Sequence, residues 1–265
     1  MTMEAAVTDA VDDLEAGFPH KELFDIEYFQ KYRHGYYSQR EQGYPIPPRN
    51  YLNLLRFLSE IQAYNAEHGN SFAKSLRTAG SDWRNCEAAF AEIIVYRYYI
   101  RLVYEGLVKS LDRDHQECDV IVERLDGSKA YLEVFCVMPN LKEPKAGEVV
   151  VQDIKTHTQT EMASIRQKLL RKIEKQKQLA KPRDNFAVIE LNDFSIAGDF
   201  AILSSLSSGY KIRIDKKTMK ATASGYDWQD SIFEDESTRF LKGIIYFDLG
   251  AYESRKFIIN PAFQV

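Results

Sequence analysis

The spacing of hydrophobic residues predicts a mainly helical first part of the chain. Residues 52–68 carry apolar side chains every three or four positions, as on one face of an amphipathic helix. Residues 85–109 carry them nearly all around the predicted helix, which indicates burial against several neighbours. Glycine and polar residues at positions 80–82 separate the two helices. We therefore expect a mainly helical, aromatic-rich lobe at residues 1–81 and a second domain at residues 82–265.

The second domain alternates between strand and helix patterns. Two of its predicted strands flank the turn signal Asp126-Gly127-Ser128, and a strongly basic helix at residues 161–179 follows them. The predicted strands are residues 118–123, 130–138, 186–191, 210–214, 243–249 and 256–259, with a further short helix at residues 199–206. This order of elements predicts an α/β fold in which helices flank both sides of a mixed β-sheet.

Composition places the chain among ordinary globular proteins, with 45% hydrophobic and 28% charged residues. Uninterrupted apolar runs such as residues 93–96 are far too short to span a membrane. The acidic first residues do not resemble a signal or transit peptide. Three widely spaced cysteines fit a reducing compartment. We therefore expect a cytoplasmic protein that does not bind membranes.

Charge is distributed unevenly along the chain. Residues 1–28 carry eight acids and one base, a net charge of −7, whereas residues 155–183 carry nine bases and two acids, a net charge of +7. Because the whole chain has a net charge of −4, a nucleic-acid partner must be bound by a local basic patch. Residues 28–51 mix tyrosines with bases, a composition that suits either stacking on nucleobases or packing of the lobe.

Four carboxylates stand among apolar residues. Glu87 and Glu92 lie on the long predicted helix, Asp119 near the start of a strand, and Glu133 at the centre of the next strand. Burying an unpaired carboxylate costs several kcal/mol, so each needs a cation, a metal or solvent. Converging acids are what Mg²⁺ requires. We predict a Mg²⁺ or Mn²⁺ site formed by Asp119 and Glu133, with Glu92 or Glu87 completing it.

The turn between the two strands decides whether such a site can form. A two-residue loop at Asp126-Gly127 puts Asp119 and Glu133 on opposite sides of the sheet. A three-residue loop from Asp126 to Ser128, or a bulge, puts both acids on one side. The metal site therefore requires the odd loop length.

This order of charged elements resembles that of the PD-(D/E)xK nuclease (restriction-endonuclease-like) superfamily. Residues 86–93 resemble its first helix, Asp119 matches its metal-binding aspartate, and Glu133 matches the acid of its ExK pair. The likeness extends over residues 82–262. It implies a restriction-endonuclease-like mixed sheet flanked by helices, and a Mg²⁺-dependent phosphodiesterase, endonuclease-like, whose expected substrate is DNA.

One position departs from the family pattern, because Phe135 stands where the resemblance calls for a lysine. On a helical wheel of the basic helix, Gln176 lies at the centre of the apolar face and Lys172 at its edge, so both are candidate catalytic residues in place of that lysine. The simpler explanation of Lys172 is a side chain that extends along the rim of the core. The basic side chains expected to contact nucleic acid are Lys168, Arg171, Lys175 and, in the aromatic stretch, Arg33.

Two further interpretations remain open. The site could be catalytically degenerate, with the fold retained as a module that binds nucleic acid or a protein partner. Alternatively, the chain is an unrelated α/β protein whose inner acids pair with Arg97 or Arg101. The sequence leaves open whether the protein forms a homodimer.

Overall fold

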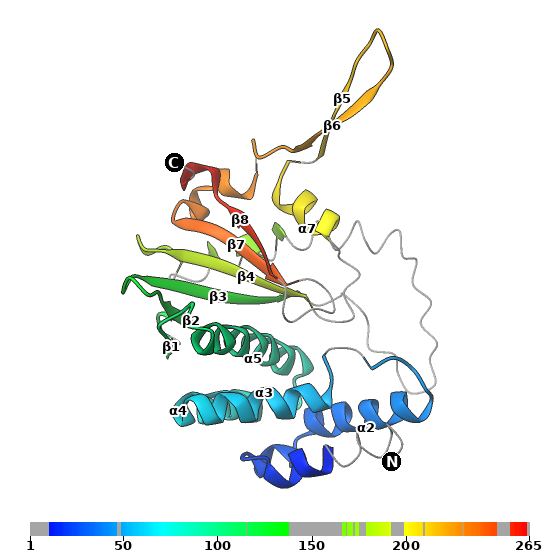
Figure 1. Ribbon diagram of the computed structural model, residues 1–265, viewed down its shortest axis with the longest axis vertical. Helices are drawn as coiled ribbons and strands as arrows, with labels where there is room; N and C mark the ends of the chain where they lie inside the picture. Colours follow the sequence, from blue (N-terminus) through cyan, green and yellow to red (C-terminus); the bar gives the residue numbers. More distant parts are fainter. Residues whose placement is uncertain are drawn as a thin grey trace. The chain divides into compact units, whose positions relative to one another are not determined.

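The computed structural model describes residues 11–46, 49–114, 116–137, 166–167, 169–171, 173–174, 179–191, 199–208, 210–229, 231–247 and 255–263. Over these residues the chain is a mixed α/β protein with one six-stranded sheet and a separate two-stranded hairpin (Figure 1). The six strands have the order β1-β2-β3-β4-β7-β8. The sequence expectation of a mixed α/β fold is therefore confirmed.

The described elements follow one another in two groups. The helices of the first part are α2 (Glu27–Glu41), α3 (Tyr51–Tyr64), α4 (Ala66–Ala79) and α5 (Trp83–Tyr104), after the short 3-10 helix η1 (Lys21–Asp25). The later elements are β1 (Ser110–Asp114), β2 (Cys118–Glu123), β3 (Lys129–Val137), β4 (Asn185–Leu191), α7 (Asp199–Leu206), β5 (Tyr210–Ile214), β6 (Ala221–Tyr226), β7 (Leu241–Phe247) and β8 (Arg255–Ile259).

The helix expected at residues 52–68 is in fact two helices, because Asn65 ends α3 and begins α4. Its backbone is extended, and its side chain accepts hydrogen bonds from the amides of Glu67 and His68, as an N-cap residue does. The two helices then pack closely. A Cβ atom added at Gly69 would lie 2.1 Å from Oε1 of Gln62, so a side chain there would force the helices apart.

The chain divides into two compact units, and the division differs from the expected boundary at residues 81/82. Unit 1 comprises the described residues within 1–115 and 119–129, and unit 2 those within 116–118, 130–249 and 255–265. α5 packs against α3 and α4, so it belongs to unit 1 together with the helices before it. Asp82 begins this helix by accepting hydrogen bonds from the amides of Arg84 and Asn85.

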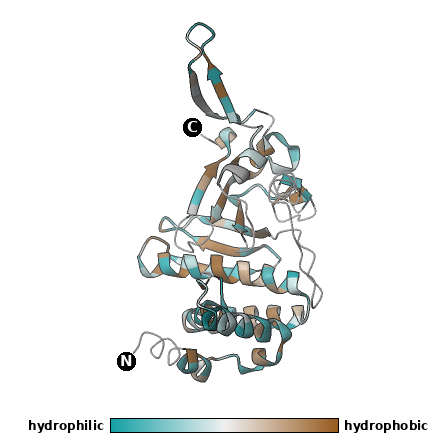
Figure 2. Ribbon diagram, turned by 90° about the vertical axis from the view of Figure 1, so that its right-hand side faces the viewer, coloured by the Kyte–Doolittle hydropathy of each residue, from teal (hydrophilic) through white to brown (hydrophobic). Residues whose placement is uncertain are grey.

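Unit 2 contains the parallel part of the sheet. β3 pairs with β4 and β4 with β7 in parallel, whereas β8 runs antiparallel to β7. Phe135, Ala187 and Ile189 belong to a buried apolar cluster that also includes Leu169, Ile173 and, from α7, Leu206. The parallel strands are thus nearly continuous in apolar residues, as buried parallel strands are (Figure 2).

Within the part of the chain that the structure describes, no helix has both the length and the apolar composition needed to cross a membrane.

Candidate functional site

The turn between β2 and β3 is a three-residue loop. The amide of Gly127 donates to the carbonyl of Arg124 at 2.9 Å, and the amide of Arg124 donates to the carbonyl of Ser128 at 2.8 Å. Gly127 has a φ of +82°, which favours glycine, and Asp126 accepts from the Ser128 amide. The loop is therefore Leu125–Gly127. The loop has the odd length that the metal hypothesis requires. It begins one residue earlier than the expected loop from Asp126 to Ser128.

Glu133 is a buried carboxylate in the middle of β3. Only 2% of its surface is exposed, and its register partner on β4 is Ala187. Its neighbours along the strand, Leu132 and Val134, are buried and apolar. Asp119, in β2, is half-buried. Both acids therefore lie on strands, as expected, and their exposure differs.

Glu87 is fully buried in unit 1, and both of its carboxylate oxygens have partners. Its Oε2 lies 2.9 Å from Nε of Arg49, whose side chain is 1% exposed. Its Oε1 accepts hydrogen bonds from the hydroxyls of Tyr28 at 2.8 Å and Tyr32 at 2.6 Å. Arg49 also donates to the backbone carbonyl of Glu87. Both carboxylate oxygens are thus engaged by a built-in cation and two hydroxyls.

The two tyrosines of this cluster are held in their neutral form. Burial raises the pKa of Tyr28 and of Tyr32 well above the ordinary value, and the Glu87 carboxylate raises both further. The ring of Tyr32 stacks on Trp83 at a centroid distance of 5.6 Å, and Arg49 lies over Phe90. Tyr28 and Phe90 are buried and therefore pack the interior of unit 1, whereas Tyr32 and Trp83 are partly exposed.

Glu92 pairs with a second buried arginine. Nη2 of Arg113, in β1, lies 2.7 Å from Oε2 of Glu92, and its guanidinium sits over the Phe72 ring at 3.5 Å. Burial lowers the pKa of Arg113, whereas the negative charges of Glu92 and Asp119 oppose that shift. Arg113 thus acts electrostatically on two of the candidate ligands. Glu92 also lines a cavity of about 520 Å³ between α4 and α5.

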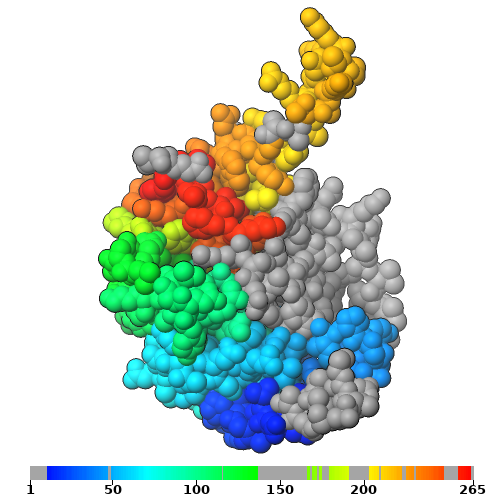
Figure 3. All heavy atoms as spheres, in the orientation of Figure 1, coloured from blue at the N-terminus to red at the C-terminus, as the bar shows by residue number. Residues whose placement is uncertain are grey.

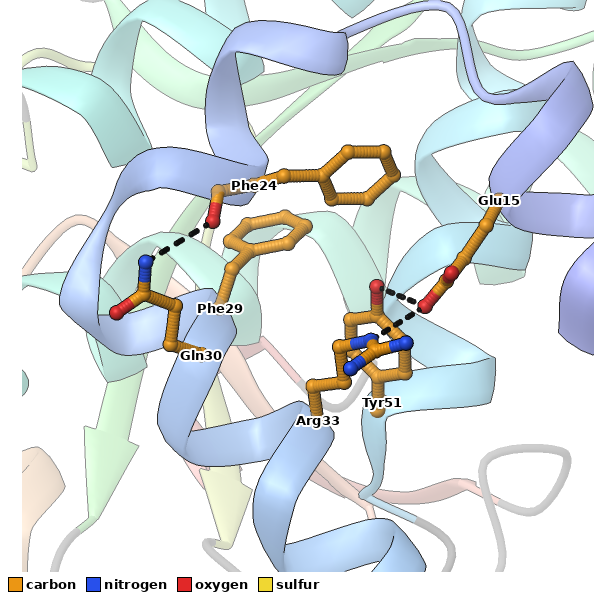
Figure 4. Close-up of a pocket in the computed structure, with 6 residues that line it drawn as sticks. All are labelled: Glu15, Phe24, Phe29, Gln30, Arg33 and Tyr51. Atoms are coloured by element: carbon orange, nitrogen blue, oxygen red, sulfur yellow. Dashed lines mark hydrogen bonds and ion pairs between the residues drawn. The ribbon is translucent and has the colours of Figure 1, made fainter.

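Arg33 is tied to the acidic N-terminal region. Its Nε lies 2.8 Å from Oε1 of Glu15, which also accepts a hydrogen bond from the hydroxyl of Tyr51 (Figure 4). These three side chains line a cavity of about 330 Å³ together with Phe24, Phe29 and Gln30. The charge of Arg33 is therefore compensated within unit 1, so we do not include Arg33 in the proposed nucleic-acid surface.

Part of the basic segment lies among the described residues. Residues 166–167, 169–171 and 173–174 are helical, with Leu169 and Ile173 buried and Arg171 exposed. Lys168, Lys172, Lys175 and Gln176 lie outside the described residues. At its end, Lys181 and Arg183 both pair with Glu117, and Arg183 also lies over the Tyr131 ring. Two of the nine bases thus serve the fold of unit 2.

The lysine expected two residues after Glu133 is replaced by a core side chain. Phe135 is 6% exposed and belongs to the apolar cluster of unit 2. Among the described residues, no group of three or more acids, histidines or cysteines has the spacing to hold a metal ion. Asp119 and Glu133 supply the hard oxygen donors that suit Mg²⁺, which keeps several of its ligands as water.

Sequence reasoning missed the two arginines that neutralise the helix acids. Arg97 and Arg101, which the alternative interpretation of an unrelated α/β protein pairs with the inner acids, form ion pairs with Glu60 and Glu105. Arg49 and Arg113 are distant in sequence from Glu87 and Glu92, so no local spacing could reveal these pairs. Comparison of the chain with protein-family models, with curated proteins and with solved structures finds no match.

Proposed function

We propose that this protein is a Mg²⁺-dependent phosphodiesterase that acts on nucleic acid, with DNA as the favoured substrate and a restriction-endonuclease-like fold. Asp119 and Glu133 are the proposed metal ligands. The order of elements supports this function: α5 is followed by β2 with Asp119, a tight hairpin turn, β3 with Glu133, and β4. The turn supports it further. The loop Leu125–Gly127 has the odd length that the metal hypothesis requires for both acids to share one side of the hairpin.

The single observation that carries the proposal is that a buried acid, Glu133 at the centre of β3, follows Asp119 of β2 across a turn of the odd length that a shared site requires. Glu133 is 2% exposed and stands between Leu132 and Val134, so water screens its electrostatic interaction with a bound cation only weakly. When bound, Mg²⁺ supplies a water of lowered pKa and neutralises charge that develops on the phosphodiester. The two carboxylates hold the ion, and the apolar neighbours of Glu133 fix its orientation.

The ligand set differs from the one expected from the sequence. Glu87 is left out, because Arg49 and two tyrosines already engage both of its oxygens. Glu92 is linked to the proposed metal site by Arg113, which forms an ion pair with Glu92 and also interacts electrostatically with Asp119. Lys172 and Gln176 keep their proposed catalytic roles, the lysine offsetting phosphate charge and the glutamine orienting water.

One observation favours a second candidate, a degenerate nuclease-fold module that binds nucleic acid or a protein without cleaving. Phe135 fills the position of the family lysine with a buried apolar side chain, so no cation can stand there. That lysine would offset charge in the transition state. The two candidates differ in whether Glu133 is needed for a measurable reaction.

The test is cleavage of plasmid DNA by the full chain with Mg²⁺ or Mn²⁺, compared with an EDTA control. The variants are Asp119→Asn and Glu133→Gln. The matched control is Glu190→Gln, which neutralises an equally buried carboxylate on β4. Glu190 pairs in register with Cys136, three positions after Glu133, and so faces the other side of the sheet.

We expect wild type and Glu190→Gln to nick the plasmid and both site variants to lose that activity while keeping their thermal stability. Equal cleavage by Glu133→Gln and wild type overturns the metal assignment. Metal-independent DNA binding that survives both substitutions, with no cleavage by any protein, supports the degenerate module instead.

A further inference from the structure

The hairpin of β5 and β6 stands out from the rest of unit 2. All residues from Tyr210 to Thr222 are exposed, and the main contacts of the two strands are with each other. In Figure 1 the hairpin extends away from α7 and from the strands of the sheet, and in Figure 3 its yellow-to-gold atoms form a projection. An isolated two-stranded hairpin is only marginally stable in water, so a segment of this kind gains from a partner.

The two sides of β5 differ in chemistry. Tyr210, Ile212 and Ile214 alternate along the strand with Lys211 and Arg213, so one side is apolar and the other basic. The isoleucines are 60% and 57% exposed, values that are unusual for such large aliphatic side chains. Figure 2 shows the same mixture of hydrophobic and hydrophilic segments along the hairpin.

The charge of the hairpin opposes that of the whole chain. Residues 210–226 contain five bases (Lys211, Arg213, Lys216, Lys217 and Lys220) and one acid (Asp215), a net charge of +4, whereas the whole chain carries −4. Lys211 pairs with Asp227. Among the described residues, no carboxylate lies within ion-pair distance of the other four bases. Their charge is therefore available to an external polyanion.

The tip of the hairpin is built to present side chains outward. Asp215 accepts hydrogen bonds from the amides of Lys217 and Thr218 at 2.8 and 2.9 Å, and its own amide donates to the carbonyl of Lys220. Met219 has a φ of +53° and is 76% exposed, so an apolar side chain stands at the outermost turn between lysines. This turn holds cations and an apolar side chain together.

We propose that the β5–β6 hairpin is an arm that binds the groove of duplex DNA, with its basic side chains on the phosphates and its apolar side toward the base edges. The major groove of B-form DNA admits a two-stranded ribbon, and apolar side chains contact thymine methyl groups there. The deep, narrow major groove of A-form RNA does not admit one. This inference rests on the proposed function and specifies how that function holds its substrate.

The experiment measures binding without chemistry. A 30-base-pair fluorescein-labelled DNA duplex is titrated with the full chain in EDTA, and anisotropy is followed from 50 to 200 mM salt. The first variant is Lys216→Gln/Lys217→Gln/Lys220→Gln. Its matched control, Arg56→Gln/Arg77→Gln/Arg84→Gln, removes the same charge from exposed positions of unit 1.

We expect the hairpin variant to bind about a hundredfold more weakly at 0.1 M salt and its salt slope to fall by about 3, because each phosphate contact releases roughly 0.9 counterion. The control should keep its affinity within about threefold of wild type. If the hairpin variant binds DNA as tightly as wild type does, or if the control variant loses as much affinity as the hairpin variant, the proposal that the hairpin binds DNA is overturned. Because EDTA removes any metal, failure here is independent of whether Glu133 supports cleavage.

A second variant tests the apolar side. Ile212→Thr/Ile214→Thr keeps β-branched residues, which favour the strand, while it replaces apolar surface. We expect this variant to bind the DNA duplex more weakly than wild type does, with an unchanged salt slope. We also expect wild type to bind a matched RNA duplex more weakly than the DNA duplex. If wild type instead sediments as a dimer that this variant dissociates, with DNA affinity unchanged, the apolar side belongs to a second copy of the chain and the proposal fails.

Discussion

Two glutamates of this chain are equally buried and differently surrounded. Glu87, on α5 in unit 1, is 0% exposed and has Arg49, Tyr28 and Tyr32 on its oxygens. Glu133, on β3 in unit 2, is 2% exposed and stands in a strand between Leu132 and Val134. Burial by itself therefore does not mark a functional acid.

The difference concerns what each carboxylate does for the fold. Glu87 compensates a buried guanidinium and ties α2, the segment before α3, and α5 together, so its charge is used inside unit 1. Glu133 stands on β3, which follows the three-residue turn after the strand of the second candidate ligand, Asp119. We therefore expect replacement of Glu87 to affect stability first, and replacement of Glu133 to affect chemistry first.

The largest effect is expected at Glu87. Glu87→Ala leaves Arg49 charged and buried without its carboxylate, so the free energy of unfolding should fall by about 3–5 kcal/mol. Urea denaturation followed by circular dichroism measures it. The double variant Arg49→Met/Glu87→Met, which removes both charges, should recover most of the loss. A loss below about 1 kcal/mol in the single variant would show that the pair is not needed.

The next effect is expected at Glu133 and appears in turnover. Glu133→Gln keeps the shape of the side chain and removes a metal ligand, so plasmid nicking should fall by at least about a hundredfold, the equivalent of several kcal/mol of metal stabilisation. Its urea midpoint should stay close to that of wild type. If Glu133→Gln unfolds as easily as Glu87→Ala, the two acids share one structural role and the contrast between them disappears.

A substitution at Arg113 tests Glu92, whose ion pair is less buried than that of Glu87. Arg113→Met deletes the partner of Glu92, which is partly exposed, so water can compensate some of the loss. We expect a decrease of about 1.5–3 kcal/mol in the free energy of unfolding, the range for a hydrogen bond to a charged group. Arg84→Met, at an exposed position on the same helix as Glu92, should change it by less than about 0.5 kcal/mol.

The smallest effect is expected at Glu15 and depends on pH. Partial burial raises the pKa of Glu15, but hydrogen bonds from Arg33 and Tyr51 outweigh it and leave the pKa below its ordinary value of 4.5. A lowered folded-state pKa means that the stabilisation is present above about pH 4.5 and is lost as pH falls through the folded pKa. Glu15→Gln should therefore have a lower Tm than wild type at pH 7, and the difference should shrink at pH 3. If the difference in Tm between Glu15→Gln and wild type grows as the pH is lowered, the direction of the predicted pH dependence is wrong.

Local patterns predicted the elements better than their assembly. Turn residues 126–128 and the alternation in residues 118–123 and 130–138 led to β2 and β3, because these signals lie within a few residues of one another. β1, β6 and α2 were not predicted. The sequence of β1, SLDRD, is polar, and that of β6, ATASGY, is small and polar, so neither shows the apolar alternation of a half-buried strand.

The sequence predicted which residue types could form the candidate site. It did not predict which side chains those residues pair with. A carboxylate at the centre of an apolar strand is visible in sequence, which is why Glu133 could be chosen. The pairing of Glu87 with Arg49, 38 positions earlier, depends on how α5 packs against the preceding helices. Long-range charge pairs of this kind follow from tertiary packing, which no spacing rule encodes.

The most direct test of the contrast between the two buried acids is a calorimetric titration of Mn²⁺ into the metal-free full chain. We expect wild type and Glu190→Gln to release the same heat of binding, and Glu133→Gln to release none while its unfolding curve stays that of a folded protein. Binding of Mn²⁺ by Glu133→Gln with the affinity of wild type would contradict the account, because the carboxylate in β3 would then be no ligand.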